Sequence, residues 1–180
     1  NTLVGDFEGN TARVIAAMRR AESQVSAPVL VFPELTLSGY PPEDLLLRPS
    51  IELRVNQSLQ AIKAAMTGDS WLVLGYPRRE GIALYNVAAV LHRGEIVAEY
   101  RKQCLPNYQV FDEVRYFQRG DSPCVVQIEG VRVGLTVCED IWEPGPVREA
   151  ARAGAELVLN LNASPYHRGK RIERWDLVAD

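Results

Sequence analysis

A chain of 180 residues, of which 47% are hydrophobic and 24% charged, has enough apolar side chains to bury the core of one domain. Its formal net charge of −3 shows no excess of lysine and arginine of the kind that binds a phosphate backbone, so we expect no nucleic-acid partner. No apolar run reaches the length that spans a bilayer, and the first residues, NTLVGDFEGN, lack the basic and apolar regions of an export signal. We therefore expect a cytoplasmic protein without a membrane partner.

The cysteines and histidines exclude two further classes. Cys104, Cys124 and Cys138 are too few and too widely spaced for a disulfide scaffold, and no CxxC pair is present, so we expect reduced thiols. His92 and His167 stand apart, without carboxylates or cysteines at ligand spacing, and we expect no metal site. A Ser/His or Cys/His nucleophile pair remains open, although neither histidine lies in a local signature for one.

The first half of the chain alternates helix and strand. Asn10 is a candidate N-cap for a helix that carries Val14 and Met18 on one face, and the apolar run VLVF predicts a short buried strand after it. PELTLSGYPPED is punctuated by proline and glycine and predicts a loop. Residues 51–66 repeat apolar side chains at helical spacing, and WLVLGYP predicts the next strand.

Two hairpins and a helical end follow. ALYNVAAVL and EIVAEYR predict a hairpin across His-Arg-Gly, and CVVQIEGVRVGLTVC predicts another that turns at Glu129 and Gly130. A helix over about residues 146–153, the strand ELVLNLNAS and a charged helix from Gly169 complete the pattern. We expect one domain with a mixed α/β sheet covered by helices and functional loops at the strand ends. Both ends look cut, so we expect the natural protein to be longer.

Three of the predicted strands end in a reactive side chain. Glu34 follows VLVFP, Lys102 follows EIVAEYR and Cys138 follows VGLTV, and strand ends are where chemistry collects in an open α/β sheet. A cysteine attacks a carbonyl as thiolate, which the adjacent carboxylates of Glu139 and Asp140 would disfavour. Glu34 as a base and Lys102 as a cation would supply what those two residues cannot.

Each of these residues also has an ordinary structural interpretation. A cysteine at the end of a buried strand is most often a small apolar filler, Glu34 beside a proline fits a loop, and Lys102 fits a solvated strand end. Cys104 is a competing thiol near the same cation. We derive no catalytic role for Asp140, for which a cap on the following turn is the structural alternative. Spacing alone leaves these interpretations open.

The residues around the three side chains resemble a known family. FPELTLSGYPPEDL, YRKQCLPNYQVFDEVRYFQRG and GLTVCEDIWEP resemble, in order, the three catalytic motifs of the nitrilase (carbon-nitrogen hydrolase) superfamily. More narrowly, SGYPPEDLL, LPNYxVFDExRYF and VCEDIW are similar to the glutamine-hydrolysing amidase domains of glutamine-dependent NAD+ synthetases. The resemblance spans Val4 to about Lys170. It implies a nitrilase-like αββα sandwich, truncated at the C-terminus, in which residues 1–180 are a partial glutaminase domain that forms homo-oligomers.

The resemblance also implies a mechanism. Cys138 would attack the side-chain amide of glutamine, while Glu34 carries the thiol proton to the departing ammonia and then activates water to hydrolyse the thioester. Lys102 would stabilise the tetrahedral oxyanion. The backbone N–H of Glu139 would be the second oxyanion donor, because the residue after a nucleophile on a tight bend points its amide at the developing charge.

Further site residues are implied by the same motifs. Glu113 would orient Lys102 and the substrate amide, and Tyr40 and Tyr108 would line the glutamine pocket. Ser164 and Lys170 are candidates to hold the α-carboxylate and backbone of glutamine. The structural alternatives are a surface acid at Glu113, half-buried packing for the tyrosines, and a solvated helix start at Lys170.

The family would pass the ammonia to a separate synthetase domain that converts deamido-NAD+ to NAD+ with ATP and Mg. No SGGxDS-like loop or GxxxxGK[ST] motif occurs here, so that domain is absent from this chain, and we expect no cofactor for the glutaminase reaction. Cys104 stands where relatives often carry histidine. Two alternatives are a free-standing amidase or carbamoylase acting on another small amide and a catalytically silent domain that binds a partner.

Overall fold

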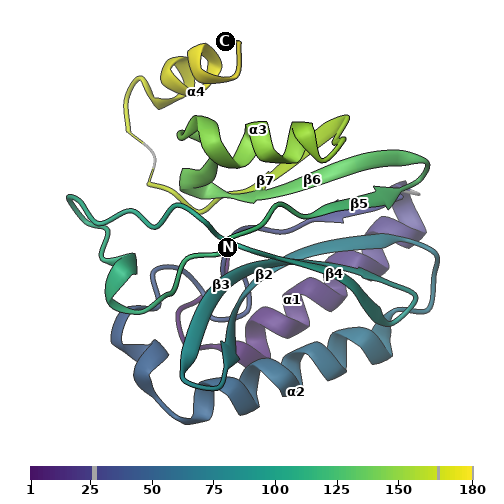
Figure 1. The fold of residues 1–180 in the computed structure, drawn as a ribbon. Helices are drawn as coiled ribbons and strands as arrows, with labels where there is room; N and C mark the ends of the chain where they lie inside the picture. Colours follow the sequence, from purple (N-terminus) through teal and green to yellow (C-terminus); the bar gives the residue numbers. More distant parts are fainter. Residues whose placement is uncertain (26–27, 166, 180) are drawn as a thin grey trace.

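A computed structural model describes residues 1–25, 28–165 and 167–179 of the chain. Its helices and strands, labelled in Figure 1, are α1 Phe7–Arg20, β1 Val29–Val31, α2 Ser50–Ala65, β2 Trp71–Glu80, β3 Ala83–His92, β4 Glu95–Arg101, β5 Val125–Ile128, β6 Val131–Val137, α3 Pro144–Arg152, β7 Leu157–Leu161 and α4 Lys170–Ala179. A π-helical turn extends α1 over Ala21–Val25, and short 3₁₀ helices cover Glu43–Leu47, Glu113–Arg115 and Cys138–Ile141.

The strands form two sheets, where the alternation of elements had suggested one. The first has the order β1-β2-β3-β4 and the second the order β5-β6-β7. The β1·β2 and β6·β7 pairs are parallel and the others are antiparallel, so both sheets are mixed. Both predicted hairpins are confirmed, as β3–β4 and β5–β6. A third, β2–β3, was not predicted, although it pairs Trp71 with His92 at one end and Glu80 with Ala83 at the other.

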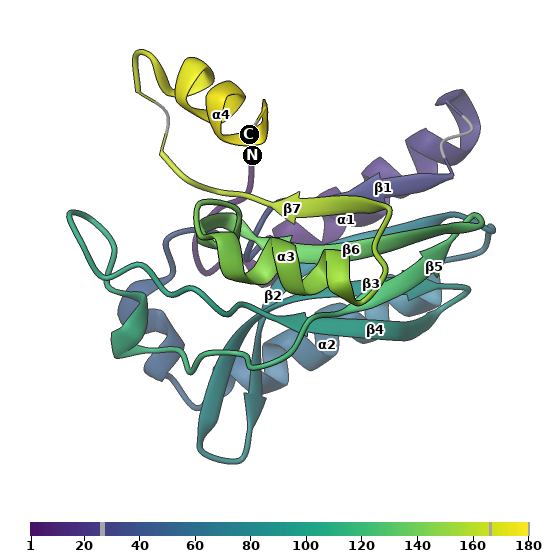
Figure 2. The ribbon, with the colours of Figure 1, turned by 45° about the horizontal axis from the view of Figure 1, so that its top comes forward.

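The two sheets pack face to face between helices. Helices α1 and α2 cover the outer face of the first sheet, and α3 covers the outer face of the second (Figure 1). Figure 2 shows the second sheet lying across the first, and α4 stands outside these layers. The αββα sandwich implied by the family resemblance is therefore confirmed.

Alternation along the strands of the first sheet sends side chains to two different cores. Leu72 and Leu74 of β2 pack with α1 and α2, whereas Val73 between them packs against Val133 and Leu135 of the second sheet. A strand buried on both faces reads as a continuous apolar run, which explains the sequences WLVLGY and VAAVL.

The first helix begins one turn earlier than the sequence predicted. Asp6 is its cap, since its Oδ1 accepts a hydrogen bond of 2.9 Å from the backbone N–H of Gly9. Asn10, our candidate cap, is instead buried inside α1, where its side chain bonds both backbone groups of Leu3 and donates to the carbonyl of Leu37 at 3.1 Å. The prediction was wrong because aspartate and asparagine are equally good caps and Phe7, just after Asp6, is a core residue.

Gly75 allows the loop after β1 to lie directly against β2. A Cβ at position 75 would come within 2.6 Å of the backbone nitrogen of Leu35 and 2.9 Å of the Cα of Glu34. These are backbone atoms that cannot swing aside as a flexible side chain could. The absence of a side chain at Gly75 therefore sets the position of the segment that carries Glu34.

We predict that Gly75→Ala displaces this segment and lowers the free energy of unfolding by about 1–3 kcal/mol, the usual cost of overpacking. Gly145→Ala is the matched control, because a Cβ there meets nothing within 4 Å. In helix α3 it should change stability by no more than about 1 kcal/mol. Urea unfolding of both variants makes the measurement, and equal stabilities would contradict the close approach at Gly75.

Candidate active site

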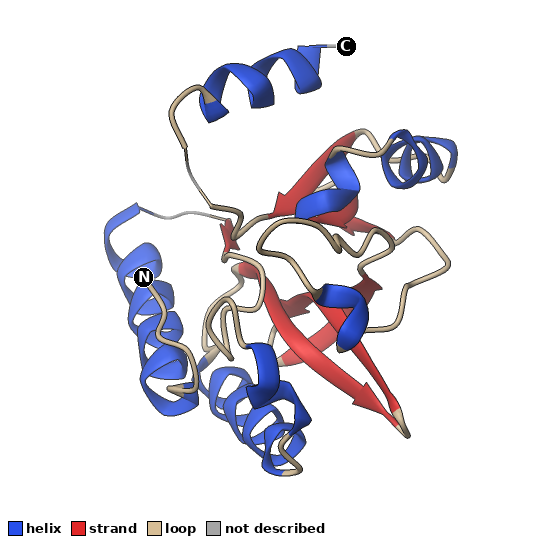
Figure 3. Cartoon of the chain, turned by 90° about the vertical axis from the view of Figure 1, so that its left-hand side faces the viewer, coloured by secondary structure: helices blue, strands red, loops and turns tan. Residues whose placement is uncertain are grey.

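The site forms where strand ends of the two sheets meet. Strands β1 and β4 run in the same direction, so the segments that follow them emerge at the same end of the first sheet. There the Nζ of Lys102 lies 2.8 Å from Oε1 of Glu34, and both side chains are inaccessible to solvent. Cys138 follows β6 of the second sheet. Figure 3 views this side of the molecule, where loops and short helices cover the strand ends.

Lys102 is an ammonium group held between two carboxylates. Its Nζ also lies 2.8 Å from each oxygen of Glu113, at the start of a short 3₁₀ helix. Burial alone would lower the pKa of this lysine, but the charges of Glu34 and Glu113 outweigh burial, and the net shift of its pKa is upward. The structure thus brings Glu34, Lys102 and Glu113 together as the motifs implied, and Lys102 stays charged.

Asn86 is a member of the cluster that the sequence analysis missed. Its Nδ2 donates to Oε1 of Glu34 at 2.8 Å, so that one oxygen accepts from both Asn86 and Lys102. Oε2 of Glu34 is buried and has no hydrogen-bond partner among the described residues. One carboxylate oxygen is therefore anchored and the other is free to accept a proton. The sequence signal was a lone amide in the apolar run ALYNVAAVL.

Cys138 lies at a strained bend. Its φ of 47° is in the left-handed region, which a residue with a side chain rarely adopts, and it joins the end of β6 to the 3₁₀ helix Cys138–Ile141. The residue is 2% exposed. Burial, followed by the charges of Glu34 and Glu113, raises the pKa of the thiol, and Lys102 only partly opposes them. The resting thiol is therefore protonated.

The other cysteine near the lysine is differently placed. Burial and the nearby Asp140 carboxylate raise the pKa of the Cys104 thiol to about 12. Asp140 itself accepts hydrogen bonds from the backbone on either side, including Val137 and Cys104. The Cys104 thiol is therefore protonated at rest, like that of Cys138.

Glu139 and Tyr108 lie beside Cys138. The backbone amide of Glu139 belongs to the first turn of the 3₁₀ helix, where amides have no partner within the helix. The Glu139 side chain accepts a 2.8 Å hydrogen bond from the hydroxyl of Tyr108. Partial burial and this carboxylate raise the pKa of Tyr108 to about 12, so the hydroxyl remains a donor.

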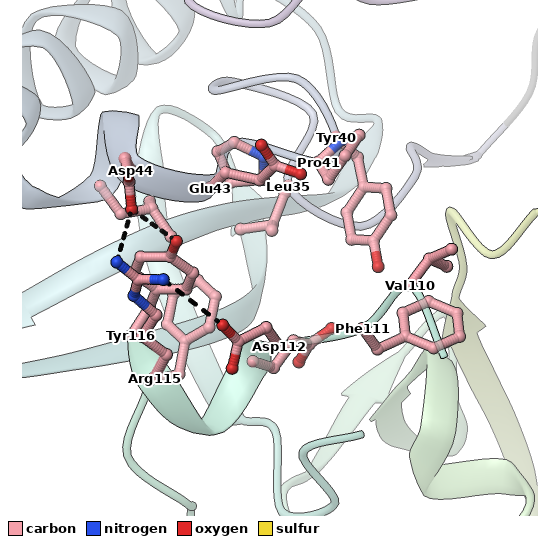
Figure 4. Close-up of a pocket in the computed structure, with 14 residues that line it drawn as sticks. Leu35, Tyr40, Pro41, Glu43, Asp44, Val110, Phe111, Asp112, Arg115 and Tyr116 are labelled. Carbon is pink, nitrogen blue, oxygen red and sulfur yellow. Dashed lines mark hydrogen bonds and ion pairs between the residues drawn. The ribbon is translucent and has the colours of Figure 1, made fainter. Parts of the chain in front are cut away.

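A cavity of about 300 Å³ lies beside the cluster and is lined by both Glu113 and Tyr40. Figure 4 shows the Tyr40 ring pointing into it, toward the segment that carries Val110 and Phe111. Burial and the charges of Glu34, Glu113 and Cys138 raise the pKa of the Tyr40 hydroxyl, so this hydroxyl stays protonated. The cavity is thus a candidate route for a substrate to the cluster.

Ser164 and Lys170 have described contacts elsewhere. Arg174 of α4 donates to the Ser164 hydroxyl at 2.7 Å, and Lys170 lies 4.1 Å above the ring of Trp142 and 3.4 Å from Glu173. No contact between the described residues joins either side chain to the cluster. Their role in binding glutamine remains a prediction.

The histidines also lie outside the cluster. His92 stacks on Trp71 and lies 3.6 Å from Asp69, and His167 lies 3.6 Å from Glu173. Within the described part of the chain, no three histidine, cysteine or acidic side chains are grouped so that they could hold a metal ion. Among the described helices, none has the length and apolar character needed to cross a membrane.

Comparison with known proteins gives consistent matches over the whole chain. The carbon-nitrogen hydrolase family model matches residues 1–180. A glutamine-dependent NAD(+) synthetase from Xanthomonas campestris pv. campestris is 49% identical over 180 residues, which are 98% of this chain and 32% of that protein. The chain therefore spans about a third of the length of this relative.

Solved structures of similar proteins match the fold of this chain. A glutamine-dependent NAD+ synthetase from Acinetobacter baumannii, in complex with ADP, superposes with a TM-score of 0.94 at 36% identity and covers 99% of this chain and 34% of its own. A mutant amidase from Nesterenkonia sp. AN1, which shows Michael addition of acrylamide at its active site cysteine, gives a TM-score of 0.85 at 27% identity. The match covers 95% of this chain and 67% of the amidase.

The ionisation of Glu113 makes the free energy of unfolding depend on pH. Burial, with the charge of Glu34 added and Lys102 opposing, raises the pKa of Glu113 from 4.5 to about 7. A carboxyl group that binds its proton more tightly when folded loses stabilisation as pH rises from its unfolded to its folded pKa. The free energy of unfolding of the wild type, relative to Glu113→Gln, should therefore fall between pH 4.5 and about 7.

Denaturant unfolding of both proteins across that range makes the measurement. Because the glutamine variant lacks the titrating group, subtraction removes the pH dependence of every other residue that the substitution leaves undisturbed. A difference that is flat, or that rises with pH, would show that folding does not raise the pKa of Glu113.

Proposed function

Because this chain belongs to the carbon-nitrogen hydrolase family, we propose that it hydrolyses the side-chain amide of glutamine with Cys138 as the nucleophile. The observation that carries the proposal is the buried cluster of Glu34, Lys102 and Glu113 next to a cysteine at a strained bend. A base, a cation and a thiol collected from three distant segments are what acyl transfer through a thioester requires.

In the first half-reaction Cys138 Sγ attacks the amide carbon while its proton passes to Glu34. The raised pKa of the thiol supports a transfer that accompanies attack. The carbonyl oxygen becomes an oxyanion, which the ammonium of Lys102 and the backbone N–H of Glu139 stabilise. When the C–N bond breaks, Glu34 returns the proton to the departing nitrogen, and ammonia leaves a thioester on Cys138.

In the second half-reaction water replaces the thiol. Glu34, again ionised, takes a proton from a water molecule that attacks the thioester carbon, and collapse of the second tetrahedral intermediate releases glutamate and returns the proton to the sulfur. Oε1 of Glu34 stays bonded to Asn86 and Lys102, so the unpartnered Oε2 is the oxygen suited to move protons in both steps.

The remaining site residues hold the lysine and the substrate. Glu113 fixes Lys102 with two bonds and is the second carboxylate near the amide. Tyr40 and Tyr108 would line the pocket of the glutamine side chain. Ser164 and Lys170 are assigned to the α-carboxylate and backbone of glutamine by the family resemblance alone. The reaction needs no metal or cofactor, because attack, proton transfer and charge stabilisation are all supplied by side chains and one backbone amide.

We further propose that the ammonia serves ATP-dependent synthesis of NAD+ from deamido-NAD+. The name of the Xanthomonas relative and the length of that protein beyond the matched third support an attached synthetase domain, where ATP and Mg would bind. We also propose that the protein forms a homo-oligomer, as the family resemblance implies, and that it works in the cytoplasm.

A free-standing amidase is the second candidate. The match to the Nesterenkonia amidase supports it, since the two folds superpose with a TM-score of 0.85 at 27% identity. Such an enzyme would use the same cluster on a different small amide. Assaying glutamine against acetamide and acrylamide separates the two candidates.

We predict that Cys138→Ala, in the complete natural protein, abolishes glutamine-dependent NAD+ synthesis and leaves synthesis from free ammonia intact, because only the thioester step is lost. Ammonia release and NAD+ formation are the two measurements. Cys124→Ala, at a partly buried thiol outside the cluster, is the control and should retain both activities. Loss of both activities, or of neither, in Cys138→Ala would contradict the assignment.

We predict that Glu34→Gln lowers kcat for glutamine hydrolysis by about 10²–10⁴-fold, the usual contribution of a general base. The amide still accepts from Lys102 but cannot take the thiol proton. Glu95→Gln, at an exposed carboxylate that bonds Lys63, controls for loss of one negative charge and should leave kcat unchanged. A Glu34→Gln enzyme with near wild-type kcat would assign the base to another residue.

A further inference from the structure

Asp140 is a buried carboxylate to which the mechanism above gives no task. It lies two residues after Cys138 and has a relative exposure of 0%. Each of its oxygens accepts two hydrogen bonds. Oδ1 accepts from the backbone N–H groups of Gln103 at 3.1 Å and Cys104 at 2.7 Å, and Oδ2 accepts from the N–H of Val137 at 2.9 Å and the hydroxyl of Tyr100 at 2.9 Å.

The donors flank the reactive residues in sequence. Val137 directly precedes Cys138, and Gln103 and Cys104 directly follow Lys102. Tyr100 belongs to β4 of the first sheet, whereas Asp140 follows β6 of the second. One side chain thus joins the backbone next to the nucleophile to the backbone next to the ammonium across the boundary between the sheets.

A cap of the short helix accounts for only part of this arrangement. The bond from Val137 is of the local kind that a residue three positions into a helix makes with the residue before it. The bonds from Gln103 and Cys104 cross 37 and 36 positions of sequence and contribute nothing to that helix. A buried carboxylate is costly unless its oxygens are occupied, and here four donors occupy them.

The hydrogen bonds of Asp140 support the bend at Cys138. A positive φ at a residue with a side chain persists only where the surroundings fix it, and the Val137–Asp140 bond closes the bend from the preceding residue. Lys102 is fixed at its tip by two carboxylates, while its backbone N–H donates to the carbonyl of Asn86 at 2.8 Å. Asp140 supplies the connection between these two fixed groups.

We propose that Asp140 is a positioning residue that holds the Cys138 sulfur in register with the Lys102 ammonium, so that the oxyanion forms within reach of both Lys102 and the Glu139 amide. The proposal rests on the amide hydrolysis proposed above and assigns no proton transfer to Asp140. Misplacement of reacting groups by about 1 Å can cost about 100-fold in rate, which is the scale of effect expected here.

Asp140→Asn tests the proposal in the complete natural protein. The asparagine side chain keeps the shape of aspartate, but an NH2 group replaces one of the two acceptor oxygens. This donor then faces the N–H and O–H donors that the oxygen had accepted from. We expect kcat for glutamine hydrolysis to fall about 100-fold, with KM changed less than about 3-fold, because the error is in the alignment of the reacting atoms and not in the pocket.

Two further variants separate positioning from general destabilisation. Tyr100→Phe removes one of the four donors and should lower kcat about 3–10-fold, the usual effect of one hydrogen bond. Val133→Ala weakens the same β6 core without touching Asp140, and its kcat per folded molecule should equal that of the wild type. Thermal unfolding of all variants gives the folded fraction at the assay temperature.

The proposal is overturned if Asp140→Asn and Val133→Ala have the same kcat per folded molecule. Should Asp140→Asn not fold, Tyr100→Phe decides, and a kcat equal to that of the wild type overturns the proposal. Alkylation of Cys138 by iodoacetamide is measured in parallel, because it reports on the position of the thiol without glutamine hydrolysis. A wild type that hydrolyses no glutamine would refute the proposed function. Slower alkylation of Cys138 in Asp140→Asn than in Val133→Ala would still support positioning in that case.

Discussion

A buried ammonium group remains charged only if opposite charges accompany it into the interior, and Lys102 meets this requirement with two glutamates. The three side chains come from the loop after β1, the end of β4 and a short helix eleven residues beyond the lysine. None of these segments can shift without leaving a charge unpaired. The ion cluster therefore fixes the loop after β1 and the segment after β4 against the first sheet. It also determines the electrostatic environment of Cys138, which follows a strand of the second sheet.

Much of the fold followed from sequence because the first sheet is buried on both faces. Runs such as WLVLGY and VAAVL could be identified as strands, and the turn at Glu129 and Gly130 placed a hairpin correctly. The hairpin between β2 and β3 was missed, since Arg78, Arg79 and Glu80 continue the strand with charged side chains. These three residues are half-buried or exposed, so the apolar signal fades although the ladder of hydrogen bonds continues.

The three reactive side chains were found at strand ends, but the residues that hold them were not. Asn86 and Asp140 act through contacts 52 and 36 positions away in sequence, and no local spacing predicts such contacts. Gly75 is similar, because its importance comes from a loop that touches it only in the folded chain. Family motifs could propose the nucleophile, the base and the cation, whereas the supporting shell required coordinates.

The protonated state of the Cys138 thiol has a consequence for the survival of the protein in a cell. Peroxides and disulfides react with thiolates far more readily than with thiols, and burial with two neighbouring carboxylates keeps the thiolate fraction of Cys138 small. Many enzymes with a cysteine nucleophile keep it ionised at rest and are easily inactivated by oxidants. In the proposed reaction Cys138 ionises only as an amide carbon arrives, and such a thiol would react slowly with oxidants between turnovers, which would make the site tolerant of oxidative stress.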